Sequence, residues 1–345
     1  MKSKVFFLAG EDEITLKKRF PELLERLIDR EFSANTWSGI KVHFGEKGNV
    51  TFVPADYSRI TVKYLKEKGA KPFLFETNTL YHGQRSNTVD HLNLAAEHGF
   101  SPSRLGAPVV IADGIRGEGS AIVPVCKKHV EEAHLGSMVP EIPVLVGISH
   151  FKGHMLTGFG ATIKNFSMGT AARKGKLFMH SLSKPWIDNE KCTQCGACAE
   201  QCAAEAIVRD GDDFVILKDK CTGCAECLGV CPVGAVKIHW DEASESASEK
   251  MAEYALAACG KKPGFYVNFL INITKDCDCL GKKMKPVTAN VGIIASRDPV
   301  AADQAGFDLV EKTIRSAHPD VNPEVQLAHA ERIGLGKRDY EMEEL

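Results

Sequence analysis

Eight of the twelve cysteines in this 345-residue chain fall within forty residues, in two runs with the same spacing. The first run is Cys192-x2-Cys195-x2-Cys198-x3-Cys202, and the second is Cys221-x2-Cys224-x2-Cys227-x3-Cys231, followed by proline. Steps of three residues let one loop turn three thiolates toward a single iron–sulfur cluster, while the fourth cysteine of each run reaches the other cluster. The two runs therefore predict two [4Fe–4S] clusters.

The spacing also assigns the ligands of each predicted cluster. One set is Cys192, Cys195, Cys198 and Cys231, and the other is Cys221, Cys224, Cys227 and Cys202. Zinc sites also use Cys-x-x-Cys pairs, but they rarely need a third cysteine at the same step and a fourth after three residues. Disulfides are typical of small secreted proteins, whereas this chain is long and its cysteines are clustered.

The segment around the cysteines has its own pattern of elements. Apolar residues at 206–208 and 214–217 flank a turn rich in Asp and Gly, which predicts a β-hairpin between the two runs. Over about 55 residues, from Trp186 to Trp240, the segment resembles bacterial-type two-cluster ferredoxins. Ala203 departs from that family, which usually has proline after the fourth cysteine, so the chain is less constrained there.

Short apolar runs alternate with helical patterns on both sides of this segment. Strands are expected at 5–8, 40–44, 73–75, 109–111, 142–148, 265–273 and 291–295. Helices are expected over 14–28 with Pro21 as the true start, over 60–65 with a stop at Gly69, over about 244–259, and from Asp298-Pro299, a cap followed by a first helical position.

This alternation predicts an α/β fold. We expect a domain with a mainly parallel sheet, formed by residues 1–185 and 241–345, and an inserted α+β ferredoxin-like module at 186–240. Two clusters within one module favour electron relay over a purely structural staple, which stays an alternative.

Charge and hydrophobicity limit the partners. The net charge is −2 and 44% of residues are hydrophobic, so no overall attraction to nucleic acid or membrane is expected. The first apolar run ends at Glu11, too short for a signal peptide or membrane span, and we expect a cytoplasmic protein. Residues 186–240 hold nine acidic and five basic residues, which favours a redox partner protein with a basic docking face.

A second candidate region lies between residues 149 and 180, directly after the expected strand at 142–148. In α/β domains, ligands usually bind beyond the carboxyl ends of the parallel strands. Its glycines allow close approach, and the cations Lys152, Lys164, Arg173, Lys174 and Lys176 favour an anionic small-molecule substrate. His150 and His154 are four residues apart and could share a helix face, as metal ligands or in proton transfer. The alternative is a glycine-rich surface loop with solvated lysines.

A third candidate is Cys277-Asp278-Cys279, after the expected strand at 265–273. Cys-x-Cys places two sulfurs near enough to chelate one additional soft metal ion or to react as a redox pair. The alternatives are incidental thiols or a purely structural site. Cys126 and Cys259 carry no motif and are expected to be small buried hydrophobes.

Most of the chain resembles the family called domain of unknown function 362, in a branch that carries a ferredoxin module. The resemblance rests on Ser149–His154, on Gly158–Gly160 with Ile163–Asn165, on Asp276–Cys279 and on Ser296–Asp303. It implies an iron–sulfur protein with an associated α/β domain and names no reaction. It also implies that the second and third candidate regions form one pocket.

Two functions fit these patterns. In the first, an oxidoreductase, two clusters deliver electrons to a basic pocket where Lys152 and Lys164 stabilise charge and His150, His154, Cys277 or Cys279 supply proton or metal chemistry. In the second, the chain is an electron carrier or redox sensor without catalysis, and its α/β domain docks a partner.

Overall fold

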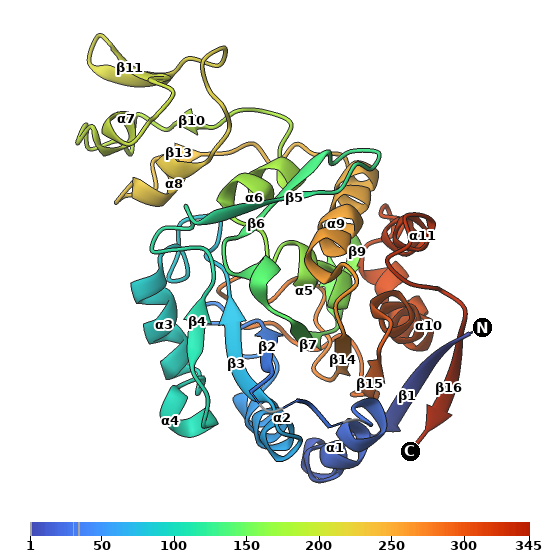
Figure 1. Cartoon of the computed structure of the whole chain (residues 1–345). Helices are drawn as coiled ribbons and strands as arrows, with labels where there is room; N and C mark the ends of the chain where they lie inside the picture. The colour runs from blue at the N-terminus through green and yellow to red at the C-terminus, as the bar shows by residue number, and fades with distance from the viewer. Residues whose placement is uncertain (1, 30, 34) are drawn as a thin grey trace.

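The computed structural model describes residues 2–29, 31–33 and 35–345. Its centre is an eight-stranded sheet of order β16-β1-β15-β14-β7-β2-β3-β4 (Figure 1). The strands are β1 Ser3–Ala9, β2 Trp37–Val42, β3 Lys71–Glu76, β4 Val109–Ile111, β7 Val144–His150, β14 Gly264–Leu270, β15 Gly292–Ser296 and β16 Tyr340–Glu344. Only β15 runs antiparallel to its neighbours, β1 and β14. The predicted α/β class with a mainly parallel sheet is confirmed.

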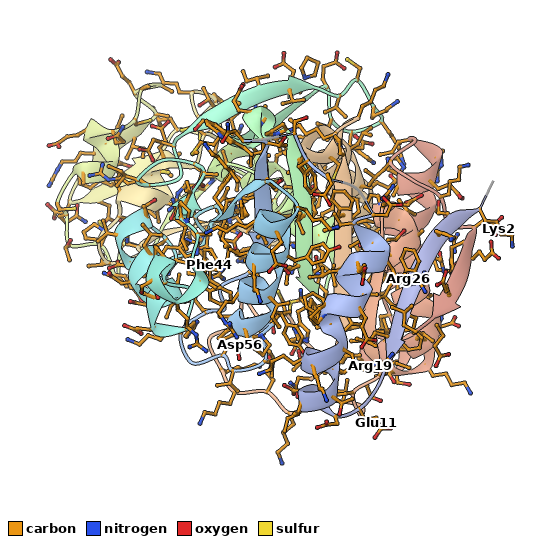
Figure 2. All side chains as sticks on the ribbon, turned by 60° about the horizontal axis from the view of Figure 1, so that its bottom comes forward. Lys2, Glu11, Arg19, Arg26, Phe44 and Asp56 are labelled. Atoms are coloured by element: carbon orange, nitrogen blue, oxygen red, sulfur yellow. The ribbon has the colours of Figure 1, made fainter. Side chains whose placement is uncertain are left out.

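Helices cover both faces of this sheet. One apolar core joins α1 (Glu13–Leu27) and α2 (Ala55–Glu67) to the sheet, and includes fully buried Phe44. The other core joins α5 (Thr162–Ser167), α9 (Ser244–Cys259) and α10 (Pro299–Ala317) to the opposite face. Figure 2 shows charged side chains such as Glu11 and Arg26 on the outside of the first layer. Removal of the apolar faces from water stabilises this three-layer arrangement.

Four further helices lie at the margins of the sheet or between the layers. They are α3 Thr88–Glu97, α4 Pro102–Leu105, α6 Arg173–His180 and α11 Glu324–Arg332. A hairpin of β5 (Ser120–Pro124) and β6 (Glu132–Gly136) crosses beside α6 (Figure 1). Across the described part of the chain, no helix combines the length and apolarity that crossing a bilayer requires.

Local capping explains where two of the helices begin. Asp298 accepts hydrogen bonds from the backbone N–H groups of Val300 and Ala301 at 2.9 and 3.1 Å, so α10 starts at the predicted position. Asp12 caps α1 in the same way, and the prediction that Pro21 starts this helix is wrong. Pro21 lies on the exposed side of the helix, and the strong cap at Asp12, nine residues earlier, decides the start. Ile14 is 78% exposed and takes no part in the predicted apolar face.

Residues 186–240 form a separate set of short elements. They are β10 Trp186–Ile187, α7 Ala197–Glu200, β11 Ile207–Asp210, β12 Asp213–Ile216, α8 Glu226–Val230 and β13 Val236–Lys237. The predicted hairpin is present as β11 and β12, with Gly211 at φ 61° in its turn. β10 pairs with β13, so the chain enters and leaves this segment at adjacent strands (Figure 1).

The segment between β7 and α5 is not a surface loop. Lys152–His154 forms β8, which pairs with β9 at Gly158–Gly160, and both strands are buried. Phe151 and Phe159 stack with ring centroids 4.9 Å apart and anchor this hairpin in the core. The alternative of a loop with solvated lysines is therefore wrong for Lys152, which is 5% exposed.

Candidate functional site

A cavity of about 580 Å³ lies at the carboxyl edge of the central sheet. Its walls include His43 after β2, Thr77 after β3, Lys152 after β7 and Cys277 after β14. These four strands run parallel, so the segments that follow them meet at one edge. The six candidate catalytic or metal-binding residues all line this cavity: His150, Lys152, His154, Lys164, Cys277 and Cys279.

The Cys277 sulfur lies in a strongly cationic position. The Lys164 Nζ is 2.8 Å from the Cys277 Sγ, and the backbone N–H of Cys279 lies 3.4 Å from the same sulfur. A hydrogen bond from the Cys279 thiol lowers the pKa of Cys277 well below that of an ordinary thiol; burial opposes this, and the charge of Lys164 adds to it. These contacts favour the thiolate form of Cys277 and the protonated form of Cys279.

Asp278 fixes the turn between these two cysteines from the side away from the cavity. It is fully buried, accepts from the Thr51 hydroxyl at 3.0 Å, and lies 2.7 Å from the Nδ1 of His150. The other ring nitrogen of His150 lies 2.9 Å from the Ile271 carbonyl, so each ring nitrogen faces an oxygen atom. Burial raises the pKa of Asp278, but His150 and Lys152 outweigh this and hold it below its ordinary value.

The cations of the cavity differ in their partners. Lys41 lies 2.6 Å from Glu76, and Arg85 lies 3.1 Å from Glu46. Lys176 donates to the Thr77 hydroxyl at 2.7 Å and to the Ala171 carbonyl, and no carboxylate of the described residues lies within ion-pair distance of it. Burial lowers the pKa of Lys176 to about 8, so it still carries its charge at neutral pH.

Burial disfavours the charged form of two histidines at the cavity, His154 and His180. His154 accepts a hydrogen bond from the backbone N–H of Thr157 at 3.2 Å, and burial lowers its pKa well below the ordinary value. Burial likewise lowers the pKa of His180 to about 3, and its Nδ1 is buried without a hydrogen-bond partner. His180 packs edge-on to Trp240 with ring centroids 4.9 Å apart. The cavity thus combines cations with neutral imidazoles.

Several sequence predictions need correction. His150 and His154 end the strands β7 and β8, so they do not share a helix face. Arg173 donates to the carbonyls of Arg116 and Ser86 and does not line the cavity, and neither does Lys174. Cys126 is exposed rather than buried, whereas Cys259 is buried as expected.

Other cavity residues were not predicted. Lys41, Glu76, Arg85, His180 and Trp240 line the cavity together with the predicted residues. The sequence did hold a signal for Lys41, because a lysine within an apolar strand is either exposed to solvent or buried against a group that pairs with its charge. The others come from segments without a motif.

The eight clustered cysteines line two small cavities in residues 186–240. Cys192, Cys195, Cys198 and Cys231 line one, and Cys202, Cys221, Cys224 and Cys227 line the other. These sets coincide with the two ligand sets assigned from the spacing, including the exchange of the fourth cysteines. Binding of iron at these cavities stays a prediction.

The donors around these cavities suit anionic sulfur ligands. The backbone N–H of Ala206 lies 3.3 Å from the Cys202 Sγ, and the N–H of Ala235 lies 3.1 Å from the Cys231 Sγ, an equivalent bond in each half. Gly196 has φ 76°, a conformation that favours glycine where backbone passes close to a ligand. Across 2–29, 31–33 and 35–345, no three His, Cys, Asp or Glu converge as around a single ion; each cysteine of a [4Fe–4S] cluster binds its own iron, which keeps the sulfurs apart.

Helix α6 and Leu80 lie between the 580 Å³ cavity and the clustered cysteines. Lys176 and His180 of α6 line the cavity. Leu177, on the same helix, packs in the apolar cluster that contains Cys198. Leu80 belongs to that cluster and also lines the cavity. One layer of side chains therefore joins the two regions.

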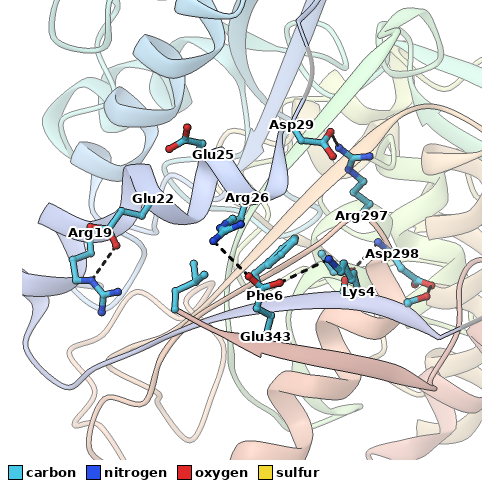
Figure 3. A pocket seen from close by; sticks show the side chains of 13 residues that line it. Lys4, Phe6, Arg19, Glu22, Glu25, Arg26, Asp29, Arg297, Asp298 and Glu343 are labelled. Carbon is cyan, nitrogen blue, oxygen red and sulfur yellow. Dashed lines mark hydrogen bonds and ion pairs between the residues drawn. The ribbon is translucent and has the colours of Figure 1, made fainter.

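A larger hollow of about 1010 Å³ beside α1 and β1 has a different character (Figure 3). Its charged side chains pair with one another: Arg19 lies 3.2 Å from Glu22, and Glu343 lies 3.9 Å from Arg26 and 3.8 Å from Lys4. Such exposed ion pairs are solvated and contribute little to the stability of the fold. None of the six candidate catalytic or metal-binding residues lines this hollow. The candidate functional site is therefore the smaller cavity, of about 580 Å³.

Known structures resemble this chain only distantly. A crystal structure of a protein from Thermotoga maritima has 11% identity and a TM-score of 0.44, covering 90% of this chain and 60% of that one. The lactate racemase apoprotein from Thermoanaerobacterium thermosaccharolyticum has 13% identity and a TM-score of 0.42, covering 91% of this chain and 58% of its own. The chain thus spans less than two thirds of either protein. No curated protein matches the sequence.

A protein family is nevertheless shown by the sequence. The pattern of the family described as Domain of unknown function (DUF362) matches residues 39–308. This range is more than half of the chain, and it contains every residue that lines the cavity as well as both cysteine runs. The chain belongs to the DUF362 family.

Proposed function

We propose that this protein is an iron–sulfur oxidoreductase, with two [4Fe–4S] clusters bound in an inserted ferredoxin-like module at 186–240. When bound, the clusters supply single electrons. The proposal rests chiefly on α6 and Leu80, which contact both the cysteine region and the cavity. Electrons that enter at the cysteines would then need to cross only this layer to reach a substrate.

The side chains of the cavity have distinct tasks in this proposal. Lys176 binds the anionic group of a small substrate, because it lines the cavity and its ammonium group contacts the Thr77 hydroxyl and the Ala171 carbonyl rather than a carboxylate. Lys164 holds the Cys277 thiolate at 2.8 Å. The Asp278–His150 pair keeps that turn in place. His154 and His180 line the cavity with lowered pKa values, so they offer the substrate hydrogen bonds from neutral imidazole rings.

The iron content tests this proposal. Protein purified without oxygen and reconstituted should contain about eight iron and eight sulfide per chain, and dithionite should produce the paramagnetic resonance signal of reduced clusters. Cys198→Ser should lower the iron content. A matched Cys126→Ser, Cys259→Ser variant should keep it, because neither cysteine lies at the two small cavities.

Three outcomes contradict the proposal in different ways. Equal iron in Cys198→Ser and wild type would refute the ligand assignment. Clusters that dithionite cannot reduce would be structural staples. Reversible reduction with no small anion that speeds reoxidation would favour the electron carrier.

We also propose that a redox partner protein docks on 186–240 through a basic face. Seven acidic residues of this segment are exposed: Glu190, Glu200, Glu205, Asp210, Asp212, Asp213 and Asp219. Such a surface attracts cations over a screening length that falls from about 30 Å at 0.01 M salt to about 10 Å at 0.1 M.

Reduction by the methyl viologen radical cation should therefore slow a few-fold over this salt range in stopped-flow measurements. Reduction by dithionite, an anion, should show the opposite trend and serves as the control. Rates that do not respond to salt with either reductant would remove the docking proposal.

A further inference from the structure

We propose that Cys277 and Cys279 form a dithiol–disulfide couple at the wall of the cavity, and that its substrate is a small anionic disulfide. The electrons that reset this couple come from the clusters, so this inference rests on the proposed function.

The first support is the arrangement of the two sulfurs. Both cysteines line the cavity, and the backbone N–H of Cys279 points to the Cys277 sulfur at 3.4 Å. Asp278 between them is tied to Thr51 and His150 behind the turn. The intervening side chain is thus held away from the cavity, and the two sulfurs stay on the same side as the substrate.

The second support is the surroundings of Cys277. The ammonium group of Lys164 lies 2.8 Å from its sulfur, where a coordinated metal cation would otherwise neutralise the charge. Among the described residues, no third His, Cys, Asp or Glu completes a metal-binding group with the two cysteines. A metal at Cys277 and Cys279 stays a prediction, but a nucleophilic thiolate with a neighbouring thiol fits these contacts better.

The third support concerns the substrate. A cavity of about 580 Å³ admits a small molecule and not the disulfide of a folded protein. Lys176 donates to the Thr77 hydroxyl and the Ala171 carbonyl, and the nearby carboxylates of Asp113 and Glu76 act on its charge without a direct contact, so its ammonium group can also bind an anionic group in the cavity. Apolar contacts from Leu80, Met155 and Trp240 can cover the rest of the ligand.

The reaction balances in three steps. The Cys277 thiolate attacks one sulfur of the substrate disulfide, which forms a mixed disulfide and releases the first substrate thiolate. Cys279 loses its proton and attacks the Cys277 sulfur, which releases the second substrate thiolate and leaves the Cys277–Cys279 disulfide. Two electrons and one proton then restore the Cys277 thiolate and the Cys279 thiol. The two released substrate thiolates take up two protons, so one substrate disulfide becomes two thiols.

The chain offers a direct readout of this couple. Trypsin cleaves after Lys275 and Lys282, so residues 276–282 form one peptide that holds both cysteines and none of the other ten. We would treat the reduced, anaerobic holoprotein with 3,3′-dithiodipropionate, quench it with N-ethylmaleimide, and measure the mass of this peptide. The expected product carries no maleimide and lacks two hydrogens, and dithionite should return it to the doubly labelled form.

Two results would overturn the proposal. If the peptide carried two maleimide labels both before and after the disulfide treatment, the two thiols would take no part in disulfide exchange. Labelling that requires a chelator would show metal ligands instead. The Cys277→Ser and Cys279→Ser variants should both lose the response and keep about eight iron, so a failure of the proposed function, seen as missing iron, is distinguishable from a failure of the couple.

The charge of the substrate is tested with a neutral probe of similar size. 3,3′-Dithiodipropionate should oxidise the peptide about tenfold faster than 2-hydroxyethyl disulfide, because a partly buried cation attracts only the anion. Lys176→Met should reduce this preference, whereas Lys174→Met, outside the cavity, should preserve it. Equal rates for the two probes in the wild type would refute the anionic substrate class.

Discussion

The Asp278→Asn variant is expected to lose about 3–5 kcal/mol of unfolding free energy, because the change leaves buried charges without their counter-ion. Asp278 is fully buried, lies 2.7 Å from His150, and lies 3.9 Å from the Lys152 ammonium. An asparagine has nearly the same size, so the loss would reflect charge and not a cavity. Urea unfolding monitored by circular dichroism measures it.

Asp276→Asn is the matched control for this variant. Asp276 lies two residues away on the same turn, and its ion pair with His318 is longer, at 3.7 Å. The control should lose less than about 1 kcal/mol. Equal losses in both variants would show that Asp278 acts through the local turn and not through buried charge.

The pH dependence of the Asp278→Asn effect has a definite sign. The pKa of Asp278 is held below its ordinary value, so its contribution to stability is complete at pH values above the ordinary carboxyl pKa and declines as the pH falls below it. The difference between wild type and Asp278→Asn should therefore shrink in acid. A difference that grows in acid would contradict the ionised state of this carboxylate.

The Lys164→Met variant should lower the alkylation rate of Cys277 at neutral pH by about tenfold, the effect of a single pKa unit on the thiolate population. The cause is the loss of an ammonium group 2.8 Å from the sulfur. Mass spectrometry of the 276–282 peptide, after brief treatment of reduced protein with iodoacetamide, measures this rate.

Lys174→Met is the control for this prediction as well, because it removes a lysine of α6 that does not line the cavity. Its alkylation rate should match that of the wild type. A raised pH should restore the rate of Lys164→Met, since more of the thiol ionises. Failure of pH to restore it would indicate blocked access to the sulfur rather than a changed pKa.

Local signals determined how much of the fold could be predicted from the sequence. The Asp298-Pro299 start of α10 depends on contacts within three residues, and its prediction is confirmed. The start of α1 was predicted wrongly because two local signals compete, and the cap at Asp12 prevails over Pro21. Strand order depends on contacts between distant segments, and no periodicity along the chain reports it.

At the candidate site, too, local motifs could be predicted from the sequence, whereas contacts between distant segments could not. Motifs drew attention to His150 and Cys277, but the bond from His150 to Asp278 spans 128 positions and has no sequence signature. The predicted helix face for His150 and His154 assumed a local period of four, whereas the parallel sheet extends this segment as strands. Arg85 enters the cavity from a segment without any motif.

The pairing of β10 with β13 has an evolutionary consequence. Trp186 lies opposite Lys237, so the two junctions of the 186–240 segment are neighbours in space. The Asp241 carboxylate accepts hydrogen bonds from the Ser181 hydroxyl at 3.0 Å and the Leu182 N–H at 2.9 Å, which ties together the two segments that flank residues 186–240. A gene could therefore gain or lose this segment in one event without pulling the α/β fold apart. Residues 186–240 and the α/β domain would then have separate evolutionary histories, and the hydrogen bonds of Asp241 would lie where the two parts were joined.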